Sequence, residues 1–514
     1  MRVLPAGDRA LLLELPDARV RRAVDAALRD DPPPGLIDLV PAATTVLLRF
    51  DGPDRLAAAV RDLPRVDAVG VRLPVDAGEP LVVPTSYDGE DLDEVAPLLG
   101  TDAAGLVAWH TSQVFTVEFG GFLPGFGYLG GPGEAPEVPR RRSPRTRIPA
   151  GAVGLAGRWT GIYPQASPGG WQIIGRTRLP VWDVRRDPPG LLTPGRRVRF
   201  VDAGPLGDGP ASDATSAASR GDSPGVSDAE VVAVGPLALI EDLGRHGLGA
   251  VGVPTGGAAD RVAHRLANRL VGNPEDAATI ELLLGGLELH AVSDLLVAAT
   301  GAPAPLAVSG RPVAWASPVH VPAGARIAVG VPGHGVRSYL AVRGGVAAER
   351  VLGSRSGDPT TGLGPPPLRV GDRLRVGSDP GGVVRSSDLT PAAHRWGGVT
   401  LRVVLGPADD WFDAASIARL TTTTWRVSSH SDRVGVRLDG GTLQRRRAGE
   451  RPSEGVVRGA VQVPASGEPL IFLADHPTTG GYPVIAVVVD DDTDLLAQCR
   501  PGDTVRMRVV PRPW

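Results

Sequence analysis

The stretch PAGAVGLAGRWTGIYP (149–164) decides the fold class, because a second stretch, PASGEPLIFLADHPTTGGYP (464–483), echoes it. Both begin with Pro-Ala and end with Thr-Gly-x-Tyr-Pro, and each final tyrosine is one of only five in the chain. The spacing of such echoes is irregular, which favours duplicated β-barrel units over a solenoid of even repeats.

Short strands are indicated throughout the chain of 514 residues. Its 68 glycines and 51 prolines punctuate Val-rich segments, a pattern typical of many short strands joined by turns. One signature, a glycine and two mostly polar residues followed by an alternating strand, recurs at GRRVRF (195–200), GARIAV (324–329), GDRLRV (371–376) and GDTVRM (502–507). The fold class predicted is therefore mainly β.

The N-terminal residues and three further segments depart from this pattern. Alternation and helical periodicity predict a β-α-β-α-β order, with strands at 10–15, 44–50 and 68–75 and helices at 17–28 and 53–63. That order is typical of a small α+β sandwich. Further helices are expected at 91–100, at 103–112, and after Asp260, where Gly272 and Pro274 end the helix.

A linker is predicted at 203–228, AGPLGDGPASDATSAASRGDSPGVSD, which has almost no large apolar side chain. It divides the chain into two parts. The domains expected are an α+β domain at 1–79, a β-barrel at 80–202, and two further β-barrel domains at 229–399 and 400–514.

Composition excludes several classes of function. The net charge of −3 favours neither nucleic acid nor an anionic membrane as a partner. The start MRVLPAGDR is no signal peptide, and the absence of an 18-residue apolar run predicts no membrane span, so a cytoplasmic location is expected. The single cysteine, Cys499, gives no disulfide framework. All 54 basic residues are arginine, so no lysine can carry biotin, form a Schiff base or serve a P-loop.

An aromatic segment, FGGFLPGFGYLGG (119–131), holds six glycines together with Phe122, Phe126 and Tyr128. A flexible linker would not concentrate scarce aromatic residues. We expect these rings to wall a cleft while the glycines let the backbone approach a ligand, with packing of the loop as the alternative.

Two polar segments are candidate sites. PRRRSPRTR (139–147) includes Arg145 and Arg147, whose guanidinium forks suit a carboxylate or phosphate; a solvated edge is the alternative. LADHPTTGGYP (473–483) groups polar side chains with Gly480 and Gly481, where backbone amides are accessible; a simple polar turn is the alternative.

Other motifs carry little weight. The only G-x-S-x-G sequence, at 221–225, lies in the linker, and its proline removes an oxyanion-hole amide. The nine histidines show no metal-ligand spacing, so no metal is expected.

These segments resemble a known family. HTSQVFTVEFGGFLPGFGYLGG (110–131), PRRRSPRTRIPAGAVGLAG (139–157) and TGIYPQASPGGWQIIGRT (160–177) resemble the B subunit of 5-oxoprolinase, also called allophanate hydrolase subunit 1 or the sporulation-kinase inhibitor family. IEDLGRHGLGAVGVPTGGAAD (240–260), SSHSDRVGVRL (428–438) and GAVQVPASGEPLIFLADHPTTGGYPVIA (459–486) resemble the C subunit, which represents the biotin-dependent carboxyltransferase-like family. Ala258 and Val434 stand where that family usually has methionine.

The resemblance implies a small α+β domain followed by cyclophilin-like β-barrels, and two normally separate subunits fused in one chain. It also implies a component of an ATP-dependent 5-oxoprolinase. That enzyme opens 5-oxo-L-proline to L-glutamate, and its B and C components are inactive without a separate 5-oxoprolinase A subunit. ATP would be the cosubstrate of the complex, with no biotin on this chain. Homo-oligomerisation is left open.

Candidate site residues follow from chemistry and from the family segments. Hydrolysis of an activated amide needs a proton acceptor and cationic or amide donors, which suits Asp475, His476 and Thr479, with His110 as a further catalytic candidate. The binding candidates are Phe122, Phe126, Tyr128, Arg145, Arg147, Tyr163, Gly170, Trp171, Ser431, Arg433, Thr478, Gly480 and Tyr482.

Two other functions stay open. The chain could be the carboxyltransferase part of a urea carboxylase or allophanate pathway, with biotin supplied by a partner. Some relatives inhibit a histidine kinase, and their C-subunit-like partners relieve that inhibition, so a regulatory protein is the third alternative. Fusion would, however, fix the ratio of inhibitor to antagonist at one to one.

Overall fold

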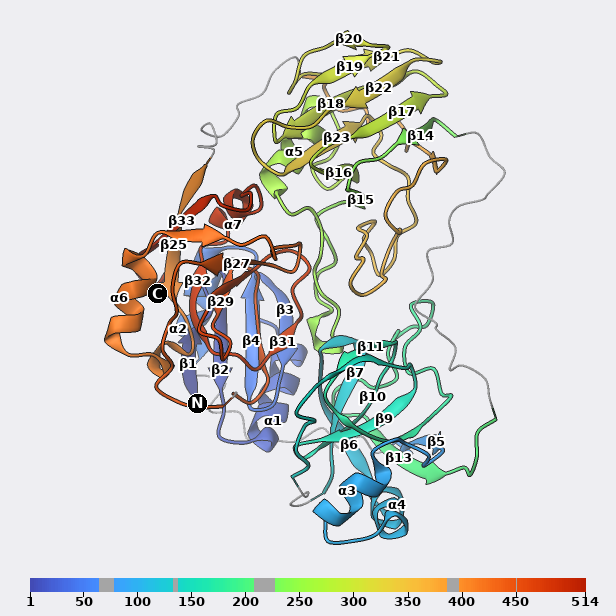
Figure 1. Cartoon of the computed structure of the whole chain (residues 1–514), viewed down its shortest axis with the longest axis vertical. Helices are drawn as coiled ribbons and strands as arrows, with labels where there is room; N and C mark the ends of the chain where they lie inside the picture. Colours follow the sequence, from blue (N-terminus) through green and yellow to red (C-terminus); the bar gives the residue numbers. More distant parts are fainter. Residues whose placement is uncertain (64–77, 133–136, 208–226, 386–396, 450) are drawn as a thin grey trace.

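A computed structural model describes residues 1–63, 78–132, 137–207, 227–385, 397–449 and 451–514 (Figure 1). The strand predicted at 68–75, the G-x-S-x-G sequence and most of the predicted linker lie outside these residues. The described chain is mainly β, as predicted. The predicted domain boundaries stay a prediction, and the units below are named by their sheets.

The N-terminal unit is a four-stranded antiparallel sheet with two helices. Its strands are β1 (Arg2–Pro5), β2 (Ala10–Glu14), β3 (Leu36–Pro41) and β4 (Thr45–Phe50), in the order β1-β2-β4-β3. Helices α1 (Ala18–Asp30) and α2 (Pro53–Asp62) follow β2 and β4. The Asp17 side chain accepts a hydrogen bond from Val20 N and begins α1. The predicted helices and the strands near 10–15 and 44–50 are confirmed, whereas β1 and β3 were not predicted.

A first barrel follows. It consists of β5 (Leu81–Thr85), β6 (Phe115–Gly121), β7 (Leu123–Gly130), β8 (Arg145–Ile148), β9 (Ala152–Ala156), β10 (Trp159–Ile162), β11 (Ser167–Gly169), β12 (Gln172–Arg176) and β13 (Arg197–Asp202). Seven strands form the sheet β12-β9-β10-β7-β6-β13-β5, and a bridge between Ser86 and Arg176 joins its two edges. The predicted helices α3 (Leu92–Leu98) and α4 (Ala103–Ser112) lie between β5 and β6.

A second barrel ends the chain. It consists of β25 (Gly398–Leu405), β26 (Trp425–Val427), β27 (Gly435–Asp439), β28 (Glu454–Gly455), β29 (Ala460–Gln462), β30 (Leu470–Phe472), β31 (Thr479–Gly480), β32 (Val484–Val488) and β33 (Thr504–Val509). The closed order is β25-β32-β29-β30-β27-β26-β33. Helices α6 (Ala414–Thr422) and α7 (Asp492–Leu496) were not predicted, because α7 has only five residues and α6 has a weaker apolar stripe at helical spacing than α5.

The two barrels have the same topology, strand for strand. Each closes through a parallel pair of its first and last strands, β5 with β13 and β25 with β33, and each carries a two-stranded side sheet, β8 with β11 and β28 with β31. The Gly-led segments at 195–200 and 502–507 form the equivalent last strands. Duplication of a β-barrel is thus the correct interpretation of the repeats at 195–200 and 502–507, whereas those at 324–329 and 371–376 lie outside both barrels.

The echo that suggested the duplication is out of register. Pro149-Ala150 precedes β9, whereas Pro464-Ala465 follows the equivalent strand β29. The positions that correspond are Gly151-Ala152-Val153 and Gly459-Ala460-Val461, an identical tripeptide in which both glycines have a left-handed φ, +80° and +85°. Glycine adopts that conformation without steric cost.

Two facing sheets form a sandwich between the barrels in the sequence. One has the order β20-β19-β22-β17-β14-β24 and the other β15-β16-β23-β18-β21. Helix α5 (Arg261–Leu270), capped by Asp260 as predicted, covers the second sheet. The remaining strands are β14 (Ala229–Ala233), β15 (Leu237–Glu241), β16 (Thr279–Leu283), β17 (Leu287–Ala291), β18 (Leu295–Gly301), β19 (Leu306–Val308), β20 (Arg311–Pro312), β21 (Val319–Val321), β22 (Arg326–Val329), β23 (Arg337–Val342) and β24 (Arg373–Leu374).

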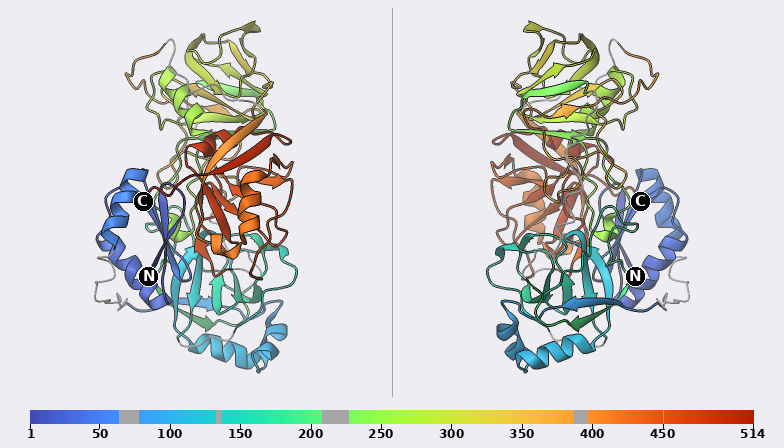
Figure 2. Two further views of the ribbon diagram at one scale, coloured as in Figure 1. Left: turned by 90° about the vertical axis from the view of Figure 1, so that its left-hand side faces the viewer. Right: turned by 90° about the vertical axis from the view of Figure 1, so that its right-hand side faces the viewer.

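Units from opposite ends of the chain share one core. The N-terminal sheet lies against the second barrel (Figures 1 and 2). Leu12 and Leu47 of that sheet are buried together with Phe472 and Val487 of the second barrel. The short 3-10 helix η2 (Gly249–Val251) lies against β3, β6 and β7. The two parts of the chain therefore pack as one body.

Candidate functional site

The junction of these units brings two of the predicted segments together. We call it the junction site: the segments 119–123, 241–258, 428–434 and 473–482, together with Arg49 of β4 and Glu281 of β16. At Gly121 of the aromatic segment, a Cβ atom would overlap Thr479 Oγ1, and at Gly120 it would overlap the Ala250 carbonyl oxygen. Glycine is needed at both positions because β6 approaches the neighbouring segments this closely.

Arg433 is the centre of a buried ionic cluster in the junction site. Its Nε and Nη2 donate to the two carboxylate oxygens of Asp475 at 2.7 and 2.9 Å. Its Nη1 donates to Glu281, and Glu241 Oε1 lies 3.1 Å from Nη2. All four side chains are at most 8% exposed, so three carboxylates share one guanidinium away from water.

The three carboxylates differ in their protonation. Burial raises the pKa of Asp475 to about 6, although Arg433 opposes the shift. Burial raises the pKa of Glu241 well above its ordinary value. Burial would also raise the pKa of Glu281, but the charges of Arg433 and Arg337 and two hydrogen bonds lower it to about 2. The cluster can therefore hold a proton on Glu241 while Glu281 remains ionised.

His476 is a neutral imidazole beside this cluster. Burial lowers its pKa to about 4. Its Nδ1 lies 2.7 Å from the Pro477 carbonyl oxygen and donates to it, which makes Nε2 the acceptor of the neutral ring. The ring stacks on Phe472 with centroids 5.6 Å apart. His476 is therefore held in one tautomer, as a proton acceptor must be.

A second histidine joins the site from the segment after β15. Arg49 Nη2 of the N-terminal sheet donates to His246 Nδ1 at 2.7 Å. Burial and the charge of Arg49 lower the pKa of His246 to about 4. The N-terminal unit thus contributes a cation to the junction site.

Several buried polar atoms of the junction site have no hydrogen-bond partner within the described ranges. They are both carboxylate oxygens of Glu241, Arg245 Nη1 and Thr478 Oγ1. Buried groups of this kind normally bind a ligand, water or another polar group. Both donors and acceptors of hydrogen bonds therefore occur among these unpaired atoms, although Glu241 Oε1 also lies 3.1 Å from the Arg433 cation.

The aromatic side chains divide into two sets. Phe126, Tyr128, Tyr163 and Trp171 are at most 7% exposed and pack edge to face in one cluster. Phe122 is 39% exposed and has a left-handed φ of +66°, which is strained for a non-glycine residue. Only Phe122 of this set, together with the 38%-exposed Tyr482, presents a ring to solvent or ligand.

The arginine-rich segment binds carboxylates of the chain itself. Arg145 forms a two-pronged ion pair with Asp91 at 2.8 and 2.9 Å, and Glu90 is also in contact. Arg141 pairs with the same carboxylate, and its amide donates to the Gly170 carbonyl oxygen at 2.9 Å. Burial would raise the pKa of Asp91, but Arg145 and the Ile173 amide outweigh it and lower that pKa. The anion that Arg145 binds is thus internal, whereas Arg147 is exposed.

His110 lies in the core of the first barrel, apart from the junction segments. Its ring nitrogens lie 2.7 Å from the Tyr87 hydroxyl and 3.0 Å from Thr160 Oγ1, and burial lowers its pKa to about 3. Both nitrogens are occupied by structural partners, so we omit His110 from the proposed site.

Two of the remaining candidates have structural partners. Ser431 Oγ donates to the Ser428 carbonyl oxygen at 2.8 Å and accepts from the Arg437 amide at 3.1 Å. Gly480 pairs with Glu454 in the side sheet of the second barrel.

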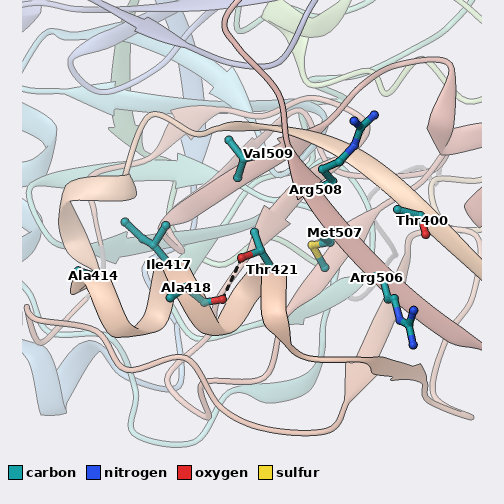
Figure 3. A pocket seen from close by; sticks show the side chains of 9 residues that line it. All are labelled: Thr400, Ala414, Ile417, Ala418, Thr421, Arg506, Met507, Arg508 and Val509. Carbon is teal, nitrogen blue, oxygen red and sulfur yellow. Dashed lines mark hydrogen bonds between the residues drawn. The ribbon is translucent and has the colours of Figure 1, made fainter.

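A wide hollow of about 770 Å³ lies outside the junction site, between α6 and β33 (Figure 3). Ile417 and Ala418 of α6 face Met507 of β33. Arg506 and Arg508 of the same strand also line the hollow. It contains none of the candidate residues. Within the described residues no three potential ligands group as a metal site, and no helix there is long and apolar enough to cross a membrane.

Sequence reasoning missed five ionisable residues of the junction site: Arg49, Glu241, Arg245, His246 and Glu281. Glu241 and Glu281 occur at buried positions of the apolar segments LALIE and TIELL. A carboxylate inside such a strand is a usable signal, because it is rarely buried without a partner.

Comparison with known proteins supports the division of the chain. The model of the carboxyltransferase domain, subdomains A and B, matches residues 251–509, and that of subdomains C and D matches residues 1–192. The chain is 36% identical to the C subunit of 5-oxoprolinase from Escherichia coli K12 over 54% of this chain and 89% of that protein. It is 38% identical to the B subunit of 5-oxoprolinase from Escherichia coli O157:H7 over 38% of this chain and 93% of that protein.

One solved structure is similar along nearly the whole chain. The crystal structure of TTHA0988 superposes with a TM-score of 0.86 at 36% identity, covering 97% of this chain and 99% of that one. The chain therefore belongs to the carboxyltransferase-domain family, with subdomains C and D fused ahead of A and B, and is homologous to the B and C subunits of 5-oxoprolinase.

Proposed function

We propose that this chain supplies the B and C components of an ATP-dependent 5-oxoprolinase, which cleaves 5-oxo-L-proline to L-glutamate together with a separate A subunit. The observation that carries the proposal is the match of one chain to about nine-tenths of both the B and the C subunits. Because both components lie in one chain, they would always be present in equal amounts.

The junction site would do its chemistry on a lactam. ATP would transfer a phosphoryl group to the lactam oxygen, which makes the amide carbon electrophilic. Water would add to that carbon, the ring C–N bond would break as the nitrogen takes up a proton, and a second water would hydrolyse the resulting acyl phosphate to L-glutamate and inorganic phosphate. His476, neutral at physiological pH, would accept a proton from the attacking water. Arg245 Nη1 and Thr478 Oγ1, buried and without a partner among the described residues, would donate to developing negative charge. Arg433 would position Asp475 and the turn that carries His476.

The test is ATP-dependent glutamate release by the purified chain with and without its cognate A subunit. Activity only in the mixture supports the proposal, and His476→Gln should then lower kcat at least about 100-fold, the usual contribution of a general base. The matched control is Arg147→Gln, an exposed change that should keep activity. Full turnover by the chain alone would contradict the need for an A subunit.

A second function is favoured by one observation. The chain is 31% identical to urea amidolyase of Lachancea kluyveri over 54% of its own length, although this spans only 16% of that protein. A carboxyltransferase role would need biotin on a partner, since the chain has no lysine. Transfer of carboxylate from a carboxybiotin carrier to urea, without glutamate release, would favour this function. Inhibition of a histidine kinase with neither reaction would favour the regulatory alternative.

A further inference from the structure

The hollow between α6 and β33 has an equivalent place in the first barrel. Helix α4 and helix α6 each lie between the first two strands of their barrel and pack against its last strand, β13 or β33. Both helices begin at an aspartate whose side chain caps them, Asp102 for α4 and Asp413 for α6. The two helices can therefore be compared residue by residue, counted from the cap.

That comparison explains why only the second barrel is hollowed. At the same distance from the cap, α4 has His110 and α6 has Thr421. His110 is buried, with its ring centroid 4.4 Å from that of Phe200 in β13, so aromatic rings fill the space. In β33, Met507 takes the place of Phe200, and Thr421 is half-buried while Ala418 is exposed. The hollow of about 770 Å³ is thus the volume that larger side chains fill in the first barrel.

An unpaired strand edge lies at this hollow. Strand β26 pairs with β33 only at Thr504 and Val505, and β25 lies along the other side of β33. The amides of Thr504 and Val510 donate to the β25 side, and in a parallel ladder alternate residues face the same neighbour. Met507 and Val509 therefore direct their N–H and C=O groups past the end of β26, and the described chain supplies no backbone partner for them. Such an edge can pair with a further strand.

The lining of the hollow is positively charged. Arg506 and Arg508 project from β33 (Figure 3), both are exposed, and the described part of the lining includes no carboxylate. No ion pair joins either arginine to a carboxylate within the described residues. Carboxylates of the adjoining helices are engaged elsewhere, because Asp492 of α7 binds Arg402 at 2.6 Å and Asp413 caps α6. Charge complementarity therefore favours an acidic occupant.

A second copy of this chain does not satisfy that requirement at the same edge. Two copies that paired their β33 edges about a two-fold axis would bring Arg506 and Arg508 of one copy beside those of the other. Like charges on neighbouring strands are destabilising. The edge therefore favours a different protein as the partner.

We propose that an extended, acidic segment of the A subunit binds in this hollow as an added strand beside β33. The proposal rests on the proposed function, in which the A subunit is the component that this chain lacks. Side chains of an added strand alternate between two faces. Apolar residues on one face would pack on Ala414, Ile417 and Ala418, and carboxylates on the other would lie beside Arg506 and Arg508. Backbone pairing with side-chain pockets at alternate positions is an established mode of peptide recognition.

The first test uses the unaltered chain and its cognate A subunit. Isothermal titration calorimetry measures the affinity, glutamate release with ATP measures the activity, and hydrogen exchange with mass spectrometry measures protection of the backbone. We expect the amides of residues 504–510 to exchange more slowly in the complex, because the added strand would bond to Met507 and Val509.

Variants then test the hollow and its charge. Ala418→Trp fills the hollow and should abolish measurable binding of the A subunit, whereas Ala415→Trp, at an exposed position of α6 outside the lining, should keep it. Arg506→Glu should weaken binding about 10-fold, because it places like charges together. Its matched control is Arg199→Glu, the equivalent exposed position of β13 in the first barrel, which should leave the affinity unchanged.

Contrary results separate this proposal from the proposed function. If the mixture releases glutamate while Ala418→Trp and Arg506→Glu bind the A subunit as tightly as the unaltered chain, the hollow is not the docking surface and the function stands. If the unaltered chain neither binds the A subunit nor releases glutamate with it, the function fails and this partner with it. Self-association that Ala418→Trp prevents would assign the hollow to a second copy. Unchanged exchange at 504–510 in the complex would overturn the assignment without any variant.

Discussion

The two barrels have equivalent strands in the same order, but an equivalent pair of loops makes different contacts in each barrel. In the first barrel the β6–β7 and β10–β12 connections meet through rings, with Phe122 against Tyr163, and Phe126 of β7 also contacts Tyr163. In the second, the equivalent β26–β27 and β30–β32 connections meet through the Arg433–Asp475 ion pair. One topology therefore fixes which loops touch, while the residues in them decide whether the contact is an apolar core or a charged site.

The polar residues of the first barrel are used in its own structure. Arg145 binds Asp91, and His110 binds Tyr87 and Thr160. The polar residues of the second barrel make contacts across the junction, since Arg433 forms ion pairs with Glu241 and Glu281 of the sandwich. On the proposed function, the chemistry would therefore lie at the second barrel, and the first barrel would form a wall of the site. Four experiments test this difference between the barrels.

The largest effect is expected for Arg433→Met. It would leave three buried carboxylates without their shared cation, and removing one partner of a buried pair costs about 3–5 kcal/mol. The matched change Arg145→Met should cost less, about 1.5–3 kcal/mol for lost charged hydrogen bonds, because Asp91 keeps Arg141 and the Ile173 amide. Urea unfolding curves measure both. Equal losses would show that the two ion pairs play the same structural part.

Next, Phe126→Ala should destabilise by about 3–5 kcal/mol, as large-to-small changes of buried aromatic residues do. Phe122→Ala removes a part-exposed ring and should cost about 0.5–1.5 kcal/mol, the contribution of its edge-to-face contacts. If Phe122 faces substrate, that variant should raise KM with little change in Tm. A large loss of stability would make Phe122 a packing residue like its neighbours.

A smaller effect, about 1–3 kcal/mol, is expected for Gly121→Ala, because the new methyl group overlaps Thr479 and forces the two loops apart. Thr479→Ala in the same chain should restore part of that stability, and a double-mutant cycle measures the coupling. Gly131→Ala is the control, since its Cβ would lie 3.5 Å from the nearest Phe115 atom, an ordinary contact. Additive losses would place the two loops out of contact.

The smallest expected effect is on the pH dependence of stability. Folding lowers the pKa of His476 to about 4 and of His110 to about 3 from an ordinary 6.5. A histidine whose pKa is lowered contributes stability above pH 6.5, and that contribution is lost as pH falls toward the folded pKa. His476→Gln and His110→Gln should therefore both flatten the acid side of a Tm–pH curve.

Activity separates the two histidines. Only His476→Gln should change the pH dependence of kcat/KM, since His110 binds only groups of its own barrel. A changed profile in His110→Gln, with that of His476→Gln unaltered, would reverse the assignment of the site between the barrels.

Local sequence patterns were sufficient to predict the fold class, the duplication of a β-barrel, and several individual helices and strands. Periodicity located α1, α2 and α5, and glycine-led alternation located β13 and β33, because these signals depend on residues next to one another in the chain. The segments that resemble the B and C subunits of 5-oxoprolinase identified the family of both halves of the chain. The out-of-register echo shows the limit of such reasoning, since short similar strings recur wherever strands meet turns.

The candidate site could be recognised only from the packing of distant segments. Arg433, Glu241 and Glu281 are separated by 40 to 192 residues, and their opposing charges become a cluster only when the sandwich packs on the second barrel. The structure also assigned Arg145 to an internal carboxylate and His110 to a core, which no local pattern distinguishes from a ligand site. The physical reason is that burial and charge pairing are properties of the space around a side chain, and most of that space is filled by distant segments.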